Sequence, residues 1–481
     1  MNISRLDFLR GGLSALGFGA LGCVRVFSAP AGWKHGGTPN LVFGVVSDTH
    51  IRTDWTGKKP SWRFPIKYFE SALEYFKAAN VDAVMHCGDF AHRGMMMSMQ
   101  FHADAWKKVF GEGRGPVKLF VSGNHDIIGG NYGDFAAKVF KDEEERKKWV
   151  LAYDIAEKWE RVWGEKYEEV WHKEVKGYHF FGRQWEIKDE MRTARFIEEN
   201  AESLSLAGTK PFFYLQHCGA GKGLNKALAT WPNAVGFFGH AHNSAASWNV
   251  IKDREGSISI QVPSCEPRGT GLLCADGYIT KAKLEGKEAA GTPRQGYVVR
   301  VYDDMLVIER REFGEGGSLG ADWVMPFGKY DPHPFSKDEL KKVIGEPQFR
   351  EGAKLLVECC QCENVAKSNT NSQLENGNIG IGNIGNTGNI RLRIPLADGN
   401  PDSRVYAYEV AVTGDDGTPK LHKAVYAVGC NMGIGHEPNG GVTTLEIPKP
   451  ELPPGNALAV AVRPLTSLGT SGKPIATEFK M

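Results

Sequence analysis

Residues 41–50 read LVFGVVSDTH: an apolar run at 41–46, then Ser47 and the tripeptide Asp48-Thr49-His50. A continuous apolar run of this length is typical of a strand that is buried on both faces, as in a parallel sheet. In α/β domains, ligands bind at the carboxyl ends of such strands. The stretch therefore predicts an α/β fold with Asp48 and His50 at the functional edge of its sheet.

Four more short motifs follow, each directly after a predicted strand. Gly88-Asp89 follows a strand at 83–87, GNHD (123–126) follows one at 117–122, His217 follows 212–216, and GHAH (239–242) follows 234–238. Helical spacing of apolar residues over 66–76 and again over 102–110 separates the first three strands. A charged stretch at 142–175, with tryptophans at roughly helical intervals, predicts a further helical segment. This alternation predicts a layered α/β domain with the five motifs along one sheet edge.

The side chains of these motifs suit metal ions. Carboxylate and amide oxygens and imidazole nitrogens are donors that Zn, Mn and Fe accept. Seven such residues are too many for one tetrahedral ion, but they fit two ions roughly 3.5–4 Å apart that share a carboxylate. A hydroxide between two such ions would attack phosphorus, while the ions neutralise charge on the phosphoryl oxygens. The alternative is a set of polar residues with only a structural role in loops and core.

The five motifs, in this order, resemble those of the calcineurin-like metallophosphoesterase family over residues 41–327. The resemblance implies a four-layer α/β/β/α domain with two divalent or trivalent transition-metal ions (Mn, Zn or Fe). It implies that one ion is held by Asp48, His50, Asp89 and His242, and that Asp89 bridges to a second ion held also by Asn124, His217 and His240. His125 would then be the catalytic acid or would stabilise the transition state.

The second motif departs from the family's protein phosphatases, which read GDxxDRG and use the second aspartate to orient the catalytic histidine. Residues 88–94 here read GDFAHRG, with His92 in that place. Either Asp126 or another carboxylate supports His125, or His125 titrates lower and acts mainly as a hydrogen-bond donor. Arg93 stands where an arginine would bind phosphate, with a surface salt bridge as the alternative. His92 also replaces the tyrosine of purple acid phosphatases, so we expect a colourless protein.

The C-terminal part of the chain has a different pattern. A main domain at 38–330 and a proline-containing linker at 331–352 precede six predicted strands between 354 and 462. Short strands separated by turns favour an all-β sandwich at 353–481. This region is similar to the fibronectin-III-like tail of exported bacterial family members. Its cysteines at 359, 360, 362 and 430 predict disulfides or buried thiols, and the Asn/Gly-rich run at 369–389 predicts a long loop.

The N-terminus has the features of an export signal. Arg5 and Arg10 accompany an apolar stretch at 13–24, which is shorter than the ~20 residues that span a bilayer. Small residues at 28, 29 and 31 would allow cleavage, so we expect a signal at 1–31 of a degenerate twin-arginine-like or Sec type. A lipoprotein signal cut before Cys23 and a buried N-terminal helix are the alternatives. The expected location is the periplasm or cell surface, with no transmembrane span after signal removal.

Charge narrows the class of partner. The chain has 58 Lys+Arg and 57 Asp+Glu, a net charge of +1, so bulk charge does not favour a nucleic-acid polymer. The expected partner is a small phosphate ester, and the sequence does not fix the oligomeric state. Trp55 and Trp62 would stack on a base or sugar or simply cover the domain surface. The leading hypothesis is a dinuclear metal-dependent phosphomonoesterase or phosphodiesterase that uses a metal-bridging hydroxide. The alternative is a non-catalytic surface binding protein with the metal domain as scaffold.

Overall fold

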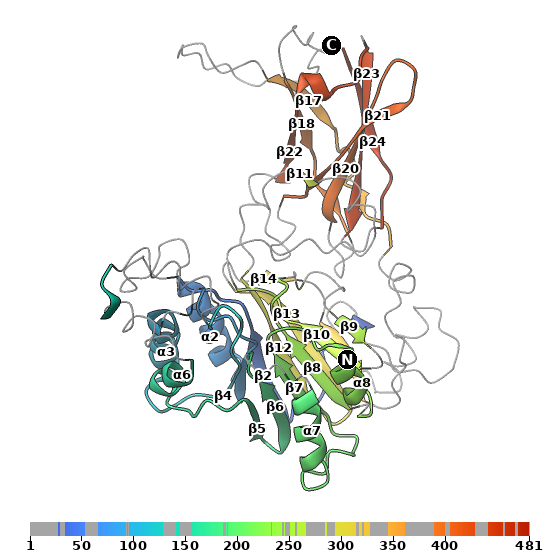
Figure 1. The fold of residues 1–481 in the computed structure, drawn as a ribbon. Coiled ribbons are helices and arrows are strands. Elements are labelled where there is room, and N and C mark those ends of the chain that lie inside the picture. Colours follow the sequence, from blue (N-terminus) through green and yellow to red (C-terminus); the bar gives the residue numbers. More distant parts are fainter. Residues whose placement is uncertain are drawn as a thin grey trace. The chain divides into compact units, whose positions relative to one another are not determined.

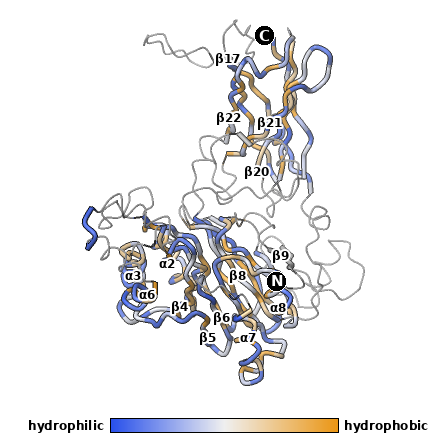
Figure 2. Tube along the Cα trace, in the orientation of Figure 1, coloured by the Kyte–Doolittle hydropathy of each residue, from blue (hydrophilic) through white to orange (hydrophobic). Residues whose placement is uncertain are grey.

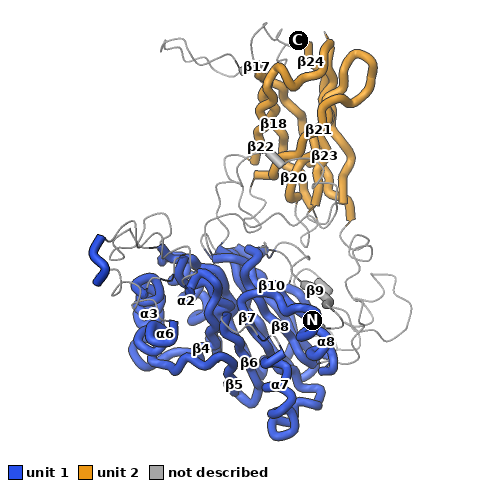
Figure 3. The backbone as a smooth tube through the Cα atoms, in the orientation of Figure 1, with its two compact units in different colours: residues 1–273, 292–343, 431–435 blue, residues 274–291, 344–430, 436–481 orange. Residues whose placement is uncertain are grey.

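The computed structural model describes these residues: 27–28, 34–52, 66–92, 94, 96–127, 141–144, 155–185, 189, 191–231, 233–242, 245, 251–254, 257–265, 284–285, 294–313, 317–319, 322–327, 345–360, 389–399, 405–428, 441–455, 457–466 and 470–480. The chain divides into two compact units (Figure 3). Unit 1 comprises 1–273, 292–343 and 431–435, and unit 2 comprises 274–291, 344–430 and 436–481. Each unit is described by itself below.

Two mixed β-sheets form the centre of unit 1 (Figure 1). The first sheet has the order β1 (Phe27–Ser28), β15 (Trp323–Pro326), β13 (Met305–Glu312), β12 (Gln295–Val301), β2 (Leu41–Val46), β3 (Ala83–His86) and β4 (Val117–Phe120), with β14 (Gly317–Ser318) paired to β13. The second has the order β5 (Val170–Val175), β6 (Tyr178–Arg183), β7 (Phe212–Gln216), β8 (Ala234–Phe238), β10 (Ser257–Gln261) and β9 (Ile251–Arg254). Strands β2, β3 and β4 run parallel, as do β6, β7, β8 and β10.

Strand β2 is buried on both faces, as its apolar run predicts. On one face the Phe43 ring lies 5.5 Å from Phe180, 5.0 Å from Phe213 and 5.9 Å from Phe237, all in the second sheet. On the other face Gly44 lies beneath Phe76, and a Cβ at Gly44 would be 2.6 Å from that ring. The two sheets therefore pack face to face, and a helix lies directly against the outer face of β2.

Helices cover the outer face of each sheet (Figures 1 and 2). α2 (Lys67–Ala78), α3 (Met96–Phe110) and α6 (Ile155–Trp163) pack on the first sheet, and α7 (Met191–Asn200) and α8 (Lys222–Leu228) pack on the second. Apolar residues of α2 at 69, 73 and 76 are buried, as their spacing predicts. The order helix, sheet, sheet, helix confirms the expected α/β/β/α domain. No helix in the described ranges combines the length and the apolarity that a membrane crossing requires.

The stretch from 142 to 175 differs from the prediction. In its described part, Glu143, Glu144 and α6 are helical, whereas Val170–Val175 is strand β5, paired antiparallel with β6. Lys176 and Gly177 have φ of 50° and 75°, which is the left-handed pair of a two-residue hairpin turn. Trp171 packs over Gly182, where a Cβ would lie 2.0 Å from its ring. The helical interpretation of Val170 and Trp171 was wrong because the tryptophan is buried by a cross-strand partner.

Unit 2 consists of β-sheets that are antiparallel except for the pairing of β11 with β21. One has the order β11 (Leu284–Glu285), β21 (Pro419–Tyr426), β20 (Val405–Thr413), β23 (Ala457–Thr466) and β24 (Ile475–Lys480). The others are β17 (Leu356–Cys360), β18 (Asn389–Ile394) and β22 (Thr443–Ile447), and the pair β16 (Gln348–Phe349) and β19 (Ala397–Asp398). Strand β18 alternates exposed and buried residues, as a strand with one core face does. The all-β character is confirmed, whereas the likeness to fibronectin-III domains stays a prediction.

Some sequence predictions fall outside the described residues. These are Arg93, Trp55, Trp62, the run at 369–388, the cysteines at 23, 362 and 430, and the side chains of Cys359 and Cys360. Cys87, Cys218 and Cys265 are described and are free thiols. Within the predicted export signal, Phe27 and Ser28 pair with Val324 and Trp323 of β15.

Candidate metal centre

The predicted metal ligands lie at one edge of the two sheets of unit 1. Asp48 and His50 follow β2, Asp89 follows β3, and Asn124 follows β4. His217 follows β7, and His240 and His242 follow β8. Both sheets therefore contribute, and the structure brings all seven side chains together in two overlapping groups.

The first donor set comprises Asp48, His50, Asp89 and His242. His242 Nε2 lies 3.1 Å from Asp48 Oδ1 and 3.1 Å from His50 Nε2. His50 Nε2 lies 3.4 Å from Asp89 Oδ2. Ligands around one Zn-sized ion, with metal–ligand bonds of about 2.0–2.2 Å, stand roughly 3 Å apart. The donor atoms of this set have that spacing.

The second donor set comprises Asp89, Asn124, His217 and His240. His217 Nε2 lies 3.1 Å from Asp89 Oδ2 and 3.0 Å from Asn124 Oδ1. His240 Nδ1 lies 3.1 Å from Asn124 Oδ1 and 3.2 Å from His217 Nε2. Asp89 Oδ2 thus belongs to both sets, and this buried Asp/His arrangement is consistent with a dinuclear metal site.

The charge of this cluster also favours cations. Asp48 and Asp89 are 0% and 1% exposed, and no lysine or arginine in the described ranges forms an ion pair with either. Burial opposes ionisation of Asp48, but the neighbouring His242 and His50 outweigh it and hold its pKa well below the usual value. Burial likewise opposes a charge on His217, yet Asp89 raises the pKa of this imidazole to about 10. Two buried carboxylates therefore require positive charge beside them, which metal ions supply.

The backbone at the donors is unusual. Asp48, His50, Asp89, His240 and His242 have φ of 54°, 45°, 60°, 72° and 51°. Left-handed conformations of residues other than glycine cost about 1–3 kcal/mol each and occur mainly where function requires them. The strain indicates that the loops serve to direct these side chains.

Glycines before two of the donors allow close contacts. A Cβ at Gly123 would lie 2.1 Å from Asp89 Oδ1, and a Cβ at Gly239 would lie 2.0 Å from Ser47 Oγ. Ser47 Oγ in turn donates a 2.6 Å hydrogen bond to Asp48 Oδ2. The glycines of GNHD and GHAH are thus required for the loops to approach each other.

His125 lies beside the first donor set. Its ring centroid is 4.7 Å from that of His50, and its backbone N–H donates to Asp89 Oδ1 at 2.8 Å. Its Nδ1 lies 2.8 Å from the backbone carbonyl of His92, and the two imidazoles stack at 5.0 Å. A carbonyl accepts but does not donate, so Nδ1 carries a hydrogen. His92, which stands where protein phosphatases have an aspartate, therefore orients His125 through its main chain.

Asp126 has a different role from the one considered for it. Its carboxylate accepts the backbone N–H groups of Asp89 at 2.9 Å, Ala91 at 2.7 Å and Gly123 at 2.8 Å. Burial and the negative charge of Asp89 raise the pKa of Asp126 to about 6. The alternative in which Asp126 supports the His125 side chain was wrong, because Asp126 instead holds two donor loops together.

Buried groups behind the donors fix the same loops. His86 accepts the Gly88 N–H at Nδ1, so its Nε2–H donates to Thr49 Oγ1 at 3.2 Å. His102 Nδ1 donates to the Ser98 carbonyl, so its Nε2 accepts from Thr49 Oγ1 at 2.8 Å. Both histidines are 0% exposed and neutral in this pattern. Thr49 is therefore held between a strand and a helix while its neighbours Asp48 and His50 face the cluster.

Sequence reasoning missed three residues near the centre. Lys158 of α6 is 1% exposed and donates to the carbonyls of Gly94 at 2.7 Å and Asp126 at 2.9 Å. The Arg52 guanidinium lies 3.2 Å from His92 Nδ1, and Trp185 stacks on His240. Arg52 could have been found from its place two residues after His50, whereas nothing near Lys158 or Trp185 in the sequence indicates the centre.

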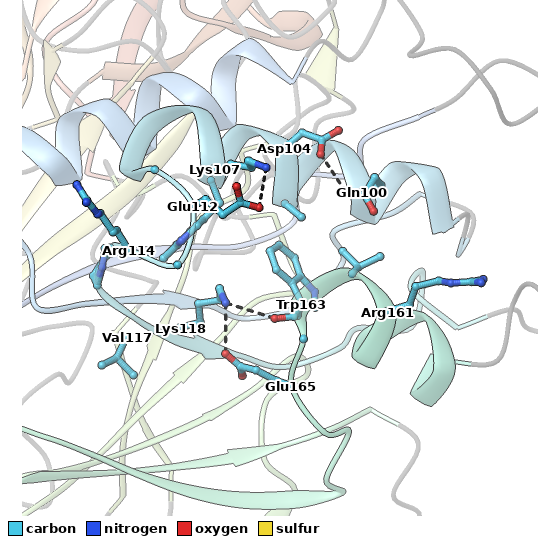
Figure 4. Close-up of a pocket in the computed structure, with 18 residues that line it drawn as sticks. Gln100, Asp104, Lys107, Glu112, Arg114, Val117, Lys118, Arg161, Trp163 and Glu165 are labelled. Carbon is cyan, nitrogen blue, oxygen red and sulfur yellow. Dashed lines mark hydrogen bonds and ion pairs between the residues drawn. The ribbon is translucent and has the colours of Figure 1, made fainter.

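A cavity of about 680 Å³ lies elsewhere in unit 1, between α3, the loop 111–116 and the end of α6 (Figure 4). None of its lining residues belongs to a donor set. Four of its charged groups form ion pairs within the lining: Lys107 with Glu112 at 2.8 Å and Lys118 with Glu165 at 3.5 Å. The donor sets, not this cavity, are therefore the candidate functional site.

Part of unit 1 matches a known family model. Residues 41–244 match the family model for calcineurin-like phosphoesterases. Among solved structures, the chain is similar to a dimetal phosphatase from Danio rerio (10% identity, 60% of this chain and 100% of that one, TM-score 0.32). It is also similar to a purple acid phosphatase from yellow lupin, Lupinus luteus (13%, 60% and 55%, 0.40), and to a phosphoesterase from E. coli (11%, 59% and 98%, 0.26). No curated protein matches the chain in sequence.

Proposed function

We propose that the calcineurin-like phosphoesterase region at residues 41–244 holds two transition-metal ions and hydrolyses phosphate monoesters or diesters. The carrying observation is the position of Asp89 Oδ2, 3.4 Å from His50 Nε2 and 3.1 Å from His217 Nε2. One carboxylate oxygen shared by two donor sets is what a pair of ions requires.

The first donor set would hold one ion and the second donor set the other, with Asp89 common to both. Such ions, when bound, acidify water and offset the negative charge of a phosphoryl group. Nitrogen- and oxygen-rich ligands suit Mn, Zn or Fe, and the donors alone do not choose among them.

His125 is the proposed acid for the leaving group. Since Nδ1 donates to the His92 carbonyl at 2.8 Å, Nε2 is the nitrogen through which a proton can pass to the leaving oxygen. Stacking on His92 and the hydrogen bond from the His125 backbone to Asp89 Oδ1 fix this ring beside the donors. We retain Arg93 as a proposed phosphate-binding residue, and the support for this role is its position in the sequence motif at 88–94.

The test combines metal analysis with turnover. The purified protein, loaded with Mn, Zn or Fe, is assayed on p-nitrophenyl phosphate and bis-p-nitrophenyl phosphate between about pH 5 and 9. We expect close to two ions per chain and hydrolysis of at least one ester. Asp89→Asn should lose both, while the control Asp322→Asn, the same change in unit 1 outside the donor sets, should retain both. A folded protein with at most one ion and no turnover would instead favour a non-catalytic scaffold.

Export and a small extracytoplasmic substrate remain part of the proposal. The basic and apolar N-terminal segment is its support. Fractionation of the native host, together with N-terminal sequencing of the mature chain, tests it. A chain that starts at Met1 in the cytoplasmic fraction would overturn it.

A further inference from the structure

Trp185 is the most exposed of the unit 1 tryptophans that the structure describes. It is 36% exposed, whereas Trp231 is half-buried and Trp106, Trp159, Trp163, Trp171 and Trp323 are at most 6% exposed. The other large apolar residues as exposed as Trp185 in the described ranges are Val117 and Leu356. Val117 is the first residue of β4, whereas the donors follow the last residues of their strands. Leu356 lies in unit 2. Trp185 is therefore the exposed large side chain at the edge where the donor sets lie.

The indole lies directly against the second donor set. Its ring stacks on His240 with centroids 5.9 Å apart and planes at 25°, and meets His217 edge-on at 5.7 Å. Because the indole contacts two members of the second donor set, a phosphate ester bound at that set would lie beside this ring. The position thus adjoins the place where the organic part of a substrate must go.

Trp185 is also held in place. Its backbone N–H donates to Ser122 Oγ at 3.1 Å, and the preceding Gln184, 2% exposed, accepts the Ser122 N–H at 2.6 Å. Ser122 Oγ further contacts the Tyr167 hydroxyl at 2.9 Å. These hydrogen bonds fix the Trp185 backbone, and the contacts with His240 and His217 hold the ring. A ring that is ordered before binding loses little entropy when a ligand stacks on it.

We propose that Trp185 is a specificity residue that stacks on a flat, unsaturated organic group of the substrate, either a nucleobase or a simple aryl ring. The inference rests on the proposed phosphoesterase function and narrows its substrate class to phosphate esters with such a group. Every aromatic ring has a π face, so stacking favours flat groups over alkyl groups. It does not depend on the hydrogen-bonding groups at the edge of the ring.

The alternative is that Trp185 merely supports His240 as a ligand. That role would affect all substrates equally and would lower metal content. Trp185→Leu keeps an apolar side chain without a π face, and Trp185→Phe keeps a flat ring. The two variants therefore separate stacking from packing.

Binding is measured by calorimetry on the metal-loaded protein, with phenylphosphonate and methylphosphonate as probes that are not hydrolysed. We expect Trp185→Leu to weaken phenylphosphonate roughly ten-fold and to leave methylphosphonate and metal content unchanged. Trp185→Phe should restore most of the loss. Equal weakening of both probes, or no change in either, overturns the stacking role.

Turnover separates this inference from the proposed function and identifies the ring. The KM values of adenosine monophosphate, phenyl phosphate and glycerol phosphate are compared in wild type and Trp185→Leu. A rise of KM for adenosine monophosphate alone identifies a nucleobase site, and a rise for both ring esters identifies an aryl site. Unchanged KM values in an active enzyme overturn the Trp185 role and leave the phosphoesterase intact. No turnover of any ester by the wild type contradicts the proposed function itself.

Discussion

At the residue scale, backbone conformation and close contacts in the donor loops determine the geometry of the metal centre. The left-handed backbone at Asp48, His50 and Asp89 and the bare glycines of the donor loops leave little space for change. The donor side chains are thereby oriented before any ion binds. A substitution that adds even one methyl group here should lower the stability of the fold and weaken metal binding.

Gly239→Ala tests this packing. Its Cβ would lie 2.0 Å from Ser47 Oγ and 2.5 Å from Asp48 Oδ2, so we expect a loss of about 1–3 kcal/mol in the free energy of unfolding and loss of bound metal. Denaturant unfolding and metal analysis measure the two effects. Gly208→Ala is the control, because its nearest neighbour would be 3.8 Å away. Equal behaviour of both variants would contradict the packing argument.

His125 and His92 should differ in a mutational test. His125→Ala removes the proposed acid and should lower kcat about 10²–10⁴-fold with both ions retained. His92→Ala keeps the backbone carbonyl that accepts from His125 Nδ1. It loses the stacked ring and the contacts of His92 Nδ1 with Arg52 and His50, so its effect should be smaller than that of His125→Ala. Steady-state kinetics and metal analysis of both variants decide. A larger loss in His92→Ala would mean that its side chain, not its carbonyl, supports the reaction.

At the element scale, the Thr49 hydrogen bonds connect α3, β3 and the loop after β2. This connection depends on neutral histidines at positions 86 and 102. Burial lowers the pKa of His102 to about 3, and burial and the neighbouring His102 lower that of His86 well below its usual value. Elements that meet through uncharged imidazoles should separate more easily in acid.

The pH dependence follows from His102. Below about pH 6.5 the His102 imidazole is protonated in the unfolded chain, whereas in the folded chain it stays neutral down to about pH 3. The free energy of unfolding therefore decreases as the pH falls through this range. The slope is about 1.4 kcal/mol per pH unit, or about 2 kcal/mol between pH 6.5 and 5. Denaturant unfolding at several pH values measures it. His102→Gln should have a shallower slope, and an identical slope would exclude His102 as a cause.

Individual elements also show how far the sequence predicts the structure. Strand β2 and helix α2 follow from local patterns, because each buries residues at its own period. Strand β6 was not predicted and β5 was taken as helix, since the Trp171 ring is buried by Gly182 across the hairpin. Motif order predicted that the seven donors meet. The His92 carbonyl and Trp185 depend on loop conformation, which no spacing in the sequence encodes.

The whole of unit 1 takes part in the metal centre. The first sheet supplies Asp48, His50, Asp89 and Asn124, and the second supplies His217, His240 and His242. Ions bound here would join two sheets that otherwise contact each other mainly through apolar side chains such as Phe43 and Phe213. Occupancy should therefore stabilise unit 1 as a whole and not only its loops.

Removal of metal tests that coupling. An ion present at 100 times its Kd stabilises the folded state by about 2.7 kcal/mol, which corresponds to a Tm rise of about 4 °C for a unit of this size. Calorimetry after chelation and after re-addition of metal measures the change. Asp322→Asn should respond like the wild type, and Asp89→Asn should not respond. A wild-type Tm that is insensitive to chelation would contradict a joint role of the two sheets.

Strand β11 has a consequence for the history of the chain. Leu284 and Glu285 pair with Ala424 and Val425 of β21, so a segment from the middle of the sequence belongs to unit 2 although unit 1 resumes after it. Recombination that replaced everything beyond residue 343 would remove β21, the strand with which β11 pairs. The two halves of the gene should thus be inherited as a single block.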